Sequence, residues 1–366
     1  MAIALLTTYL AGYRMALYER LADRHGVEVL CYGRGDRYAP AWFRDLDRQL
    51  QAAPFPARRL GGPAEAFGAA RHYDAVIAPF AGGAILPAAF AGARHARRPF
   101  VLWASVWAQP RSPAHLLALP VTRHIYRRAD AVLAYGEHVR RFVAGIRGRD
   151  DDVFVAPQSV EAELFGRDVS AQEVAGFRTR HDLGDRLIAL YVGRLVPEKG
   201  VGVLLEAWRQ VSGEAELVFI GDGPASEQAA ASGARMLGAL PRGELPVAYA
   251  SAALALLPSV PTPRFREPWG LVCNEAMHQG RPVIASDSVG AVAGGLVRDG
   301  ETGLVVPAGD ADALARAIRR LLDDEPLRAR LGAAARVGVA PYTYDAMVSA
   351  FDAALATAMR PSPTGP

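Results

Sequence analysis

Lysine is almost absent from this sequence. Of the 41 basic side chains among its 366 residues, Lys199 alone is a lysine and the others are arginines. A pyridoxal-phosphate-dependent phosphorylase needs one lysine for its cofactor in addition to a lysine at its phosphate site, so the single lysine argues strongly against that class. It also singles out the segment around position 199.

Cysteine is scarce too. Cys31 and Cys273 stand 242 positions apart, a separation that fits neither a disulfide framework nor the spacing of metal ligands. We expect two single buried thiols and a reducing compartment.

An export signal and a membrane span are also missing. The N-terminal segment MAIALLTTYLAGYR lacks the basic region of a signal peptide, and its apolar run is short enough to be a first strand. The longest uncharged stretch, residues 75–93, is broken by Pro79, Gly82, Gly83 and Pro87, so it predicts a strand, a turn and a helix of small residues. We therefore expect a cytoplasmic, globular protein.

The net charge of +3 conceals an asymmetry along the chain. Residues 1–150 carry 21 basic and 11 acidic side chains, a balance of +10, whereas residues 151–366 carry 20 and 27, a balance of −7. Between Arg94 and Arg149, eleven arginines face only Asp130 and Glu137. Such a block concentrates anionic partners and predicts peripheral contact with an anionic membrane at its inner face; solvated helix faces in an arginine-rich protein are the alternative.

Short apolar runs alternate with longer amphipathic segments throughout, which indicates strand–helix units on parallel sheets. The length fits two domains of about ordinary size. We predict an α/β protein with two doubly wound, Rossmann-like domains facing a cleft: residues 1–165, residues 166–340, and a C-terminal helix from 341 that packs back on the first domain, ending in a disordered tail. The predicted strands are 2–7, 27–32, 74–79, 100–105, 131–136 and 153–157, then 187–193, 216–221, 253–258 and 282–286.

Two glycine-bearing turns follow strands of the second half. In GRLVPEKG (193–200) a glycine at a strand end permits close backbone approach, Arg194 offers a planar fork for phosphate oxygens, and Lys199 offers a compact ammonium. Together these groups can neutralise a diphosphate without a metal. GDGP (221–224) predicts a strand-to-helix turn in which Asp222 hydrogen-bonds its own backbone, a structural rather than a catalytic element.

A third motif runs from Glu267 to Met277, EPWGLVCNEAM. Pro268 and Gly270 place Glu267 on a loop, and a helix follows whose exposed first amides suit an anion. Glu275 comes eight positions after Glu267, one turn beyond Leu271 on the same helix face. Both carboxylates could accept hydrogen bonds from sugar hydroxyls beside a bound diphosphate.

These motifs carry a resemblance. The segment from Leu187 to Leu321 resembles the donor-binding domain of family-4-type retaining glycosyltransferases (glycosyl transferases group 1), which have the GT-B fold. Its hallmarks are an Arg/Lys pair after a strand, a GDGP-like turn and two glutamates separated by seven residues. GRPVIASDSVG and GLVRDGETGLVVPAGD, which follow here, are also characteristic of that group.

The resemblance implies roles for individual residues. Arg194 and Lys199 would bind the diphosphate of a nucleotide-sugar donor and stabilise it as the leaving group, in place of a metal. Glu275 would hold the ribose hydroxyls, and Glu267 would contact the sugar or the adjacent phosphate. Transfer would retain the anomeric configuration, the departing phosphate taking the acceptor proton. The implied catalytic residues are Glu267, Arg194 and Lys199; the implied donor-binding residues are Gly12, Gly193, Arg194, Lys199, Leu240 (in the segment 237–246 that seats the base), Glu267, Gly270, Leu271 and Glu275, with no metal and no cofactor.

The first half departs from the family pattern. Gly12 matches a glycine loop near the donor phosphates, although the usual double glycine is Ala11-Gly12 here. Many members carry a histidine after the strand corresponding to 100–105, where this chain has Ser105, Val106 and Trp107. His115 or His124 could substitute, and the choice stays open.

Two clusters have ordinary structural explanations. Trp103 and Trp107 could stack on sugar rings or lipid, but core packing explains them equally well. The run Asp150–Asp152 is reminiscent of a metal-binding pattern and lies in a loop away from the proposed cleft, so we discount it.

Several functional alternatives remain. The acceptor is expected to be a glycan or lipid-linked; the base and sugar of the donor are not specified by the sequence. A sugar-nucleotide 2-epimerase of the same fold, and a nucleotide- or membrane-binding module without catalysis, compete with the transferase. A nucleic-acid partner is not expected, because the chain has no P-loop, zinc spacing or aromatic RNA-binding signature.

Overall fold

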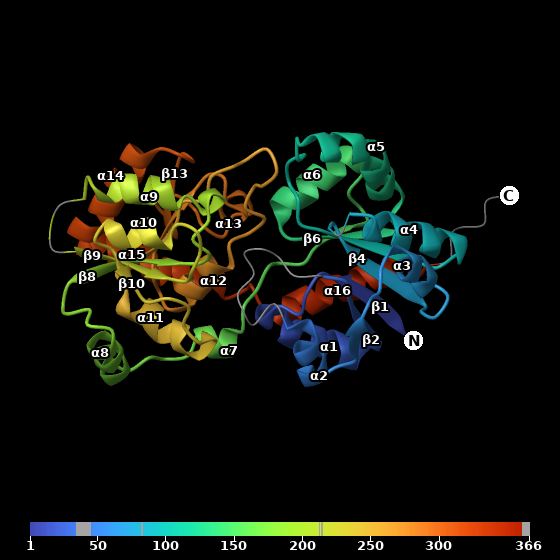
Figure 1. Ribbon diagram of the computed structural model, residues 1–366, viewed down its shortest axis with the longest axis horizontal. Coiled ribbons are helices and arrows are strands. Elements are labelled where there is room, and N and C mark those ends of the chain that lie inside the picture. The colour runs from blue at the N-terminus through green and yellow to red at the C-terminus, as the bar shows by residue number, and fades with distance from the viewer. Residues whose placement is uncertain (34–44, 82, 212, 214, 361–366) are drawn as a thin grey trace. The chain divides into compact units, whose positions relative to one another are not determined.

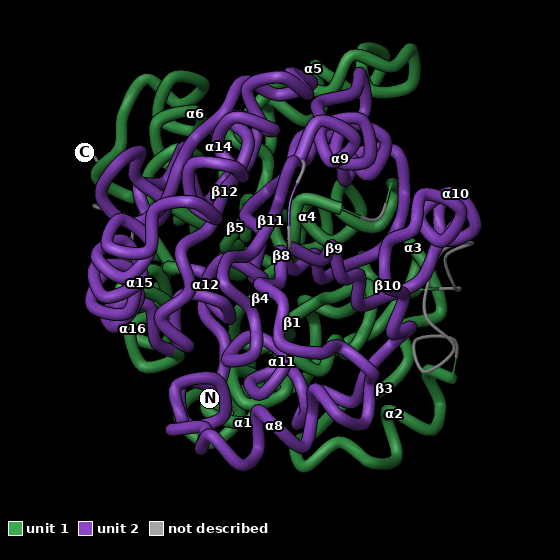
Figure 2. The backbone as a smooth tube through the Cα atoms, turned by 90° about the vertical axis from the view of Figure 1, so that its left-hand side faces the viewer, with its two compact units in different colours: residues 1–157, 344–366 green, residues 158–343 purple. Residues whose placement is uncertain are grey.

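A computed structural model of the protein describes residues 1–33, 45–81, 83–211, 213 and 215–360. The chain divides into two compact units, shown in different colours in Figure 2. Unit 1 comprises residues 1–157 and 344–366, and unit 2 comprises residues 158–343. The predicted tail, 361–366, lies outside the described residues.

Unit 1 contains one parallel sheet of seven strands in the order β3-β2-β1-β4-β5-β6-β7. Helices lie on both faces of the sheet (Figure 1). The strands are β1 (Ile3–Thr7), β2 (Val27–Cys31), β3 (Ala57–Arg59), β4 (Ala75–Pro79), β5 (Phe100–Ala104), β6 (Ala131–Ala134) and β7 (Val153–Val155). The helices are η1 (Gly12–Arg14), α1 (Met15–His25), α2 (Leu46–Ala52), α3 (Pro63–Ala69), α4 (Ile85–His95), α5 (Pro113–Arg128), α6 (Glu137–Arg147) and the C-terminal α16 (Tyr344–Ala358).

The central strand β1 shows why this sheet is buried on both faces. Ile3 and Leu5 join a core cluster with α1 and α16, whereas Ala4 and Leu6 join a second cluster with α3 and α4. All four side chains are fully buried. Because successive side chains of a strand point to opposite faces, an unbroken apolar run such as IALL needs helices on both sides.

Helix α16 returns the end of the chain to unit 1. It contacts α1 and the strands β5, β6 and β7. Phe351 packs edge-on against Trp103, with 5.2 Å between ring centroids, so Trp103 is a core residue. The chain first passes from unit 1 to unit 2 after Pro157, eight residues before the predicted domain limit of 165. Residues 158–165 belong to unit 2 because Phe165 is buried there and its carbonyl oxygen accepts a hydrogen bond from Gln279 of the same unit.

Unit 2 contains a parallel sheet of six strands in the order β10-β9-β8-β11-β12-β13. The strands are β8 (Leu187–Val192), β9 (Ala215–Ile220), β10 (Arg235–Met236), β11 (Leu254–Leu257), β12 (Val283–Ser286) and β13 (Gly303–Val306). The helices are α7 (Ala162–Phe165), α8 (Ala171–Arg180), η3 (Pro197–Lys199), α9 (Val201–Trp208), α10 (Ser226–Ala231), η4 (Arg242–Glu244), α11 (Leu245–Ser251), α12 (Leu271–His278), α13 (Gly290–Ala293), α14 (Ala311–Asp323) and α15 (Glu325–Val339).

Both sheets have the strand order of doubly wound nucleotide-binding folds. The order reverses between β1 and β4 in unit 1 and between β8 and β11 in unit 2. In open parallel sheets ligands bind beyond the carboxyl ends of the strands at such a reversal, because the chain leaves the two strands in opposite directions there and opens a crevice. In unit 2 the segments at this point are the loops that follow β8 and β11.

Candidate functional site

The loop after β8 is shaped by two glycines that touch. Gly193 has φ 149°, and a Cβ on Gly221 would lie 2.1 Å from the Gly193 carbonyl oxygen. The Leu195 amide donates to the Asp222 carbonyl oxygen at 2.9 Å, and the Ala225 amide donates to the Leu195 carbonyl oxygen at 3.0 Å. The GDGP turn therefore packs against the GRLVPEKG loop and hydrogen-bonds to it. The backbone of the GDGP turn makes these hydrogen bonds, whereas the sequence predicted a role for the Asp222 side chain.

Lys199 ends the short helix η3, and its ammonium forms an ion pair and hydrogen bond with Glu267 Oε2. The Ser259 hydroxyl donates to the same oxygen at 3.0 Å. The Phe265 ring lies 5.5 Å from the ammonium, measured to the ring centroid. The structure thus brings together two of the predicted catalytic side chains, one from the loop after β8 and one from the loop after β11.

Glycines on both sides of this pair fix its geometry. Gly200 has φ 74°, and a Cβ there would lie 1.9 Å from the Pro258 carbonyl oxygen. Gly270 has φ 98°, and a Cβ there would meet Leu257 at 2.4 Å. Only glycine permits both the left-handed backbone and the close approach to the end of β11. The loop after β8 thus touches the end of β11 at Gly200, and the loop after β11 packs on the Leu257 side chain at Gly270.

Helix α12 begins at Leu271 with Gly270 as its N-cap, as predicted for the amides of this turn. Its start is anchored internally, since Trp269 Nε1 donates to Asn274 Oδ1 at 2.7 Å and Asn274 Nδ2 donates to the Gln158 carbonyl oxygen at 2.9 Å. The first amides of a helix carry partial positive charge and favour an anion. Glu267 precedes this turn by three residues, so Lys199 lies near the same end of α12.

Glu275 lies on the second turn of α12 and is buried, with 9% of its surface exposed. The Tyr249 hydroxyl of α11 donates to Glu275 Oε2 at 2.7 Å. Burial raises the pKa of Glu275 above its ordinary value, and the Tyr249 hydrogen bond and the Arg242 charge oppose that rise only in part. A carboxylate held in this way is oriented on one oxygen and can accept hydrogen bonds on the other.

The other predicted donor residues are found as follows. Arg194 is half-buried, its carbonyl oxygen accepts a hydrogen bond from the Tyr191 hydroxyl at 2.8 Å, and among the residues described its guanidinium has no carboxylate partner. Leu240 is half-buried after β10. In unit 1, Gly12 begins η1 beyond β1, and a Cβ there would meet nothing within 4 Å.

The two candidate histidines differ in position. His115 lies in the first turn of α5, and its Nδ1 is 2.6 Å from the Ser112 hydroxyl. His124 lies two to three turns later and lines a hollow with Arg94 and Asp130, at the amino ends of the strands. His124 therefore lies at the edge of the sheet opposite to the one that binds ligands, and the geometry favours His115 of the two.

Sequence reasoning missed several residues at these positions. Tyr249 and Ser259, which hold the two glutamates, are distant in sequence from their partners and no local pattern marks them. His138 is the second residue of α6, four positions after the end of β6; it is 4% exposed and packs edge-on against Trp107, with 5.2 Å between ring centroids. The run Asp150–Asp152 is a structural anchor: Asp152 pairs with Arg147 and Arg149.

Residues 177–337 match the family model described as glycosyl transferases group 1. This segment, less than half of the chain, belongs to the group 1 glycosyl transferases. The match covers the elements that build the Lys199–Glu267 pair and α12, so the site just described lies within the family's segment.

Named relatives agree with this assignment. The chain is 32% identical over 260 residues to alpha-D-kanosaminyltransferase of Streptomyces kanamyceticus, covering 68% of this chain and 61% of the relative. It is 33% identical over 239 residues to the GDP-mannose-dependent alpha-(1-6)-phosphatidylinositol monomannoside mannosyltransferase of Mycolicibacterium smegmatis, covering 60% of each. The chain thus spans about three fifths of the length of these relatives.

Solved structures show the same GT-B fold. The Anabaena protein HepE in complex with UDP superposes with a TM-score of 0.80 at 21% identity, covering 98% of this chain and 100% of that chain. Sucrose-phosphate synthase of Thermosynechococcus elongatus gives a TM-score of 0.70 at 24% identity, covering 96% and 97%. Each of the two units therefore has the Rossmann-like architecture of the GT-B fold.

Among the helices that the structure describes, none is both long and apolar enough to span a bilayer.

Proposed function

We propose that this protein is a retaining, metal-independent glycosyl transferase of group 1 that moves a sugar from a nucleoside-diphosphate sugar to a glycan or lipid-linked acceptor. The observation that carries the proposal is the Lys199–Glu267 pair, placed at the point where the strand order of unit 2 reverses and near the start of α12. The pair, the helix amides and Arg194 together form a site for a diphosphate.

The proposed chemistry follows from these charges. The bond between the sugar C1 and the diphosphate oxygen breaks, and a bond from C1 to the acceptor oxygen forms on the same face. The acceptor proton passes to the departing phosphate oxygen. Lys199 and Arg194 stabilise the negative charge that develops on the diphosphate, because fixed positive groups in a partly buried site act most strongly where charge appears in the transition state.

The two glutamates have separate proposed roles. Glu267 keeps the Lys199 ammonium in position before the donor binds, and then contacts the sugar or the adjacent phosphate. Glu275, oriented by Tyr249, accepts hydrogen bonds from the ribose hydroxyls. Relatives and neighbours differ in the nucleotide that their names give, GDP-mannose for the mannosyltransferase and UDP for HepE, so the base of the donor has to be measured.

A ligand panel tests this function. Thermal shifts with UDP-, GDP-, dTDP- and ADP-sugars should show stabilisation by one nucleotide series. With that donor and EDTA present, the wild type should transfer or hydrolyse the sugar, and Lys199→Ala and Arg194→Ala should lower kcat by about a hundredfold or more. Epimerised donor in the absence of acceptor would replace the transferase by a 2-epimerase. Binding without any turnover would leave a nucleotide-binding module.

Contact with an anionic membrane is a second part of the proposal, supported by α5. Leu116, Leu117 and Val121 on this helix are 53%, 85% and 51% exposed, which is unusual for large apolar side chains. Arg123 and Arg127 lie exposed on the same helix. Apolar residues beside arginines favour the interface of an acidic bilayer. Flotation with acidic and with neutral liposomes tests this: the wild type should float with the acidic ones only, and Leu117→Ser should float less. Equal recovery from both would overturn it.

A further inference from the structure

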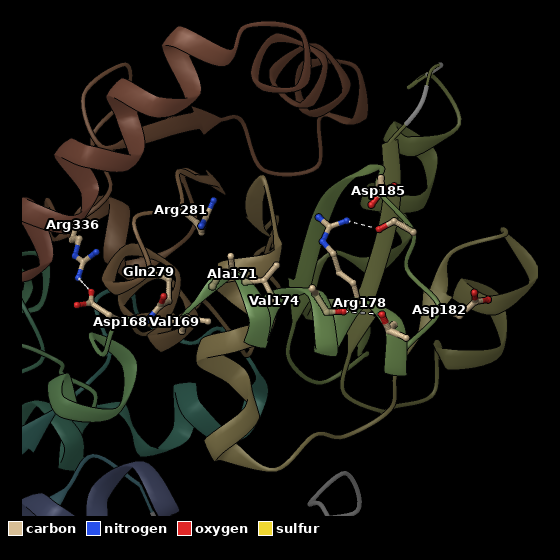
Figure 3. A pocket seen from close by; sticks show the side chains of 14 residues that line it. Asp168, Val169, Ala171, Val174, Arg178, Asp182, Asp185, Gln279, Arg281 and Arg336 are labelled. Carbon is tan, nitrogen blue, oxygen red and sulfur yellow. Dashed lines mark hydrogen bonds and ion pairs between the residues drawn. The ribbon is translucent and has the colours of Figure 1, made fainter.

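A cavity of about 970 Å³ lies in unit 2 away from the proposed donor site. It is bounded by α8, α11, α15 and the connection from α12 to β12 (Figure 3). Asp185 precedes β8 by two residues and Arg281 precedes β12 by two residues, so the cavity lies at the amino ends of the strands. The Lys199–Glu267 pair lies beyond their carboxyl ends, at the opposite edge of the sheet.

Arg281 is the side chain that makes this cavity unusual. In the view of Figure 3 it stands between the Arg336–Asp168 pair on one side and Arg178 on the other. Its Nε is buried and, among the residues described, has no hydrogen-bond partner. A buried guanidinium nitrogen without an acceptor has lost its hydrogen bonds to water without forming one in the protein, and this desolvation costs free energy of folding.

The neighbouring charges add to this imbalance. Arg178 donates to the carbonyl oxygens of Gly184, Arg186 and Ser251 at 2.7, 3.1 and 2.8 Å, and none of these is a carboxylate. Burial lowers the pKa of Arg281, and the charge of Arg178 lowers it further. Two guanidinium charges therefore repel each other inside the cavity, and an anion between them would relieve both the repulsion and the missing hydrogen bond.

The cavity is lined by three acidic residues, Asp168, Asp182 and Asp185, and all three are exposed. The side chains of Asp168 and Asp182 are 96% and 92% exposed, and they pair with Arg336 and Arg235 at 3.1 and 3.4 Å. Exposed pairs of this kind contribute little, so Arg336 can exchange Asp168 for another anion at small cost. Val169 and Val174 provide an apolar wall beside the arginines. The interior thus offers positive charge together with an apolar surface.

We propose that this cavity is a second anion site of the protein, which binds a phosphate group through Arg281, with Arg178 and Arg336 adding charge. The ligand is inorganic phosphate or the phosphate of a small monoester, whose organic part would lie against the valine wall. A guanidinium fork matches the oxygens of a phosphate in two parallel hydrogen bonds, which is why arginine suits this role. The site is separate from the one that would hold the donor diphosphate.

Isothermal titration of the full chain with sodium phosphate, glucose 1-phosphate and glycerol 3-phosphate at matched ionic strength tests the proposal. The wild type and Lys199→Ala should bind at least one of these saturably with equal affinity. Arg281→Met should weaken binding by about tenfold or more, and Arg281→Lys by less, because an ammonium keeps the charge but loses the fork. Arg209→Gln, at an exposed arginine of the same unit outside the cavity, should stay within about twofold, as expected of a distant surface charge.

Two further observations decide the interpretation. In phosphate-free buffer Arg281→Met should be at least as stable as the wild type, because it removes a half-buried guanidinium whose Nε has no hydrogen-bond partner among the described residues. Phosphate should raise the Tm of the wild type and of Lys199→Ala more than that of Arg281→Met. Tighter binding of a monoester than of inorganic phosphate would identify the organic source. The proposal is overturned if the wild type binds none of the three, if Arg281→Met binds equally well, or if binding disappears in Lys199→Ala alone, which would place the phosphate at the donor site.

Discussion

The pairing of Lys199 with Glu267 leads to a prediction about stability that is separate from activity. The two side chains are 16% and 7% exposed, so removing the lysine leaves a carboxylate that is buried and has the Ser259 hydroxyl as a hydrogen-bond donor. Breaking a buried ion pair on one side costs about 3–5 kcal/mol. Because Lys199 is partly exposed and the Ser259 hydrogen bond remains, we expect Lys199→Ala to lower the free energy of unfolding by about 3 kcal/mol, the lower end of that range.

Neutralising the partner should reverse much of this loss. In Lys199→Ala/Glu267→Gln no uncompensated charge stays buried, so the double variant should be about 2 kcal/mol more stable than Lys199→Ala. For a unit of this size, 3 kcal/mol corresponds to a decrease in Tm of about 6–12 °C. Scanning calorimetry of the wild type, both single variants and the double variant gives the coupling directly.

The activity of the same four proteins completes the test. Both variants that lack Lys199 should have kcat lowered by about a hundredfold or more, although the double variant regains stability, because the proposed mechanism requires the ammonium at the diphosphate. A double variant as unstable as Lys199→Ala would refute the reasoning, since the lost stability could not then come from the unpaired charge of Glu267. An active double variant would refute the role of Lys199 at the leaving group.

Other substitutions test the remaining contacts. Glu275→Gln should be more stable than the wild type near pH 8 and equal to it below about pH 4.5. The pKa of Glu275 is raised in the folded protein, so the wild type loses stability as the pH rises through that pKa and the buried carboxyl ionises. Tm measured as a function of pH tests this, and the affinity for the donor should fall. Tyr249→Phe should weaken donor binding through the loss of one orienting hydrogen bond, by about 1 kcal/mol in titrations, and an unchanged affinity would refute that orienting role. Gly200→Ala should cost about 2–3 kcal/mol, because its Cβ would collide with the Pro258 carbonyl, whereas Gly202→Ala, where a Cβ meets nothing within 4 Å, should be neutral or stabilising in denaturation curves.

The long apolar strands could be predicted because each is an uninterrupted run bounded by turn residues. β1, β8 and β11 begin and end within two residues of their predicted limits, and α14 begins after Asp310, whose side chain accepts a hydrogen bond from the Ala313 amide as its cap. The strands β3, β10 and β13 were missed. β3 (ARR) and β10 (RM) have three and two residues, mostly arginine, so neither shows an apolar run. β13 (GLVV) has only three apolar residues between Gly303 and Pro307.

The site was predictable to a similar degree. Lys199 and Glu267 lie in the loops after two neighbouring strands, and the carboxyl ends of parallel strands meet at one edge, so their pairing follows from the order of the strands. The partners Tyr249 and Ser259 could not be found in this way. Tyr249 lies on α11, 26 residues before Glu275, and its hydroxyl reaches the carboxylate only because α11 packs against α12.

The single lysine of the chain acquires a physical meaning from these contacts. Its ammonium occupies a small space between the Glu267 carboxylate, the Ser259 hydroxyl and the Phe265 ring, and Gly200 holds the adjacent backbone against the end of β11. A guanidinium is a wide planar fork, whereas an ammonium is a compact donor that can turn among several acceptors. Arg194 already supplies a fork in the same loop. In the proposed mechanism, a compact charge beside a planar one allows one group to orient the diphosphate and the other to follow the charge as it moves onto the leaving oxygen.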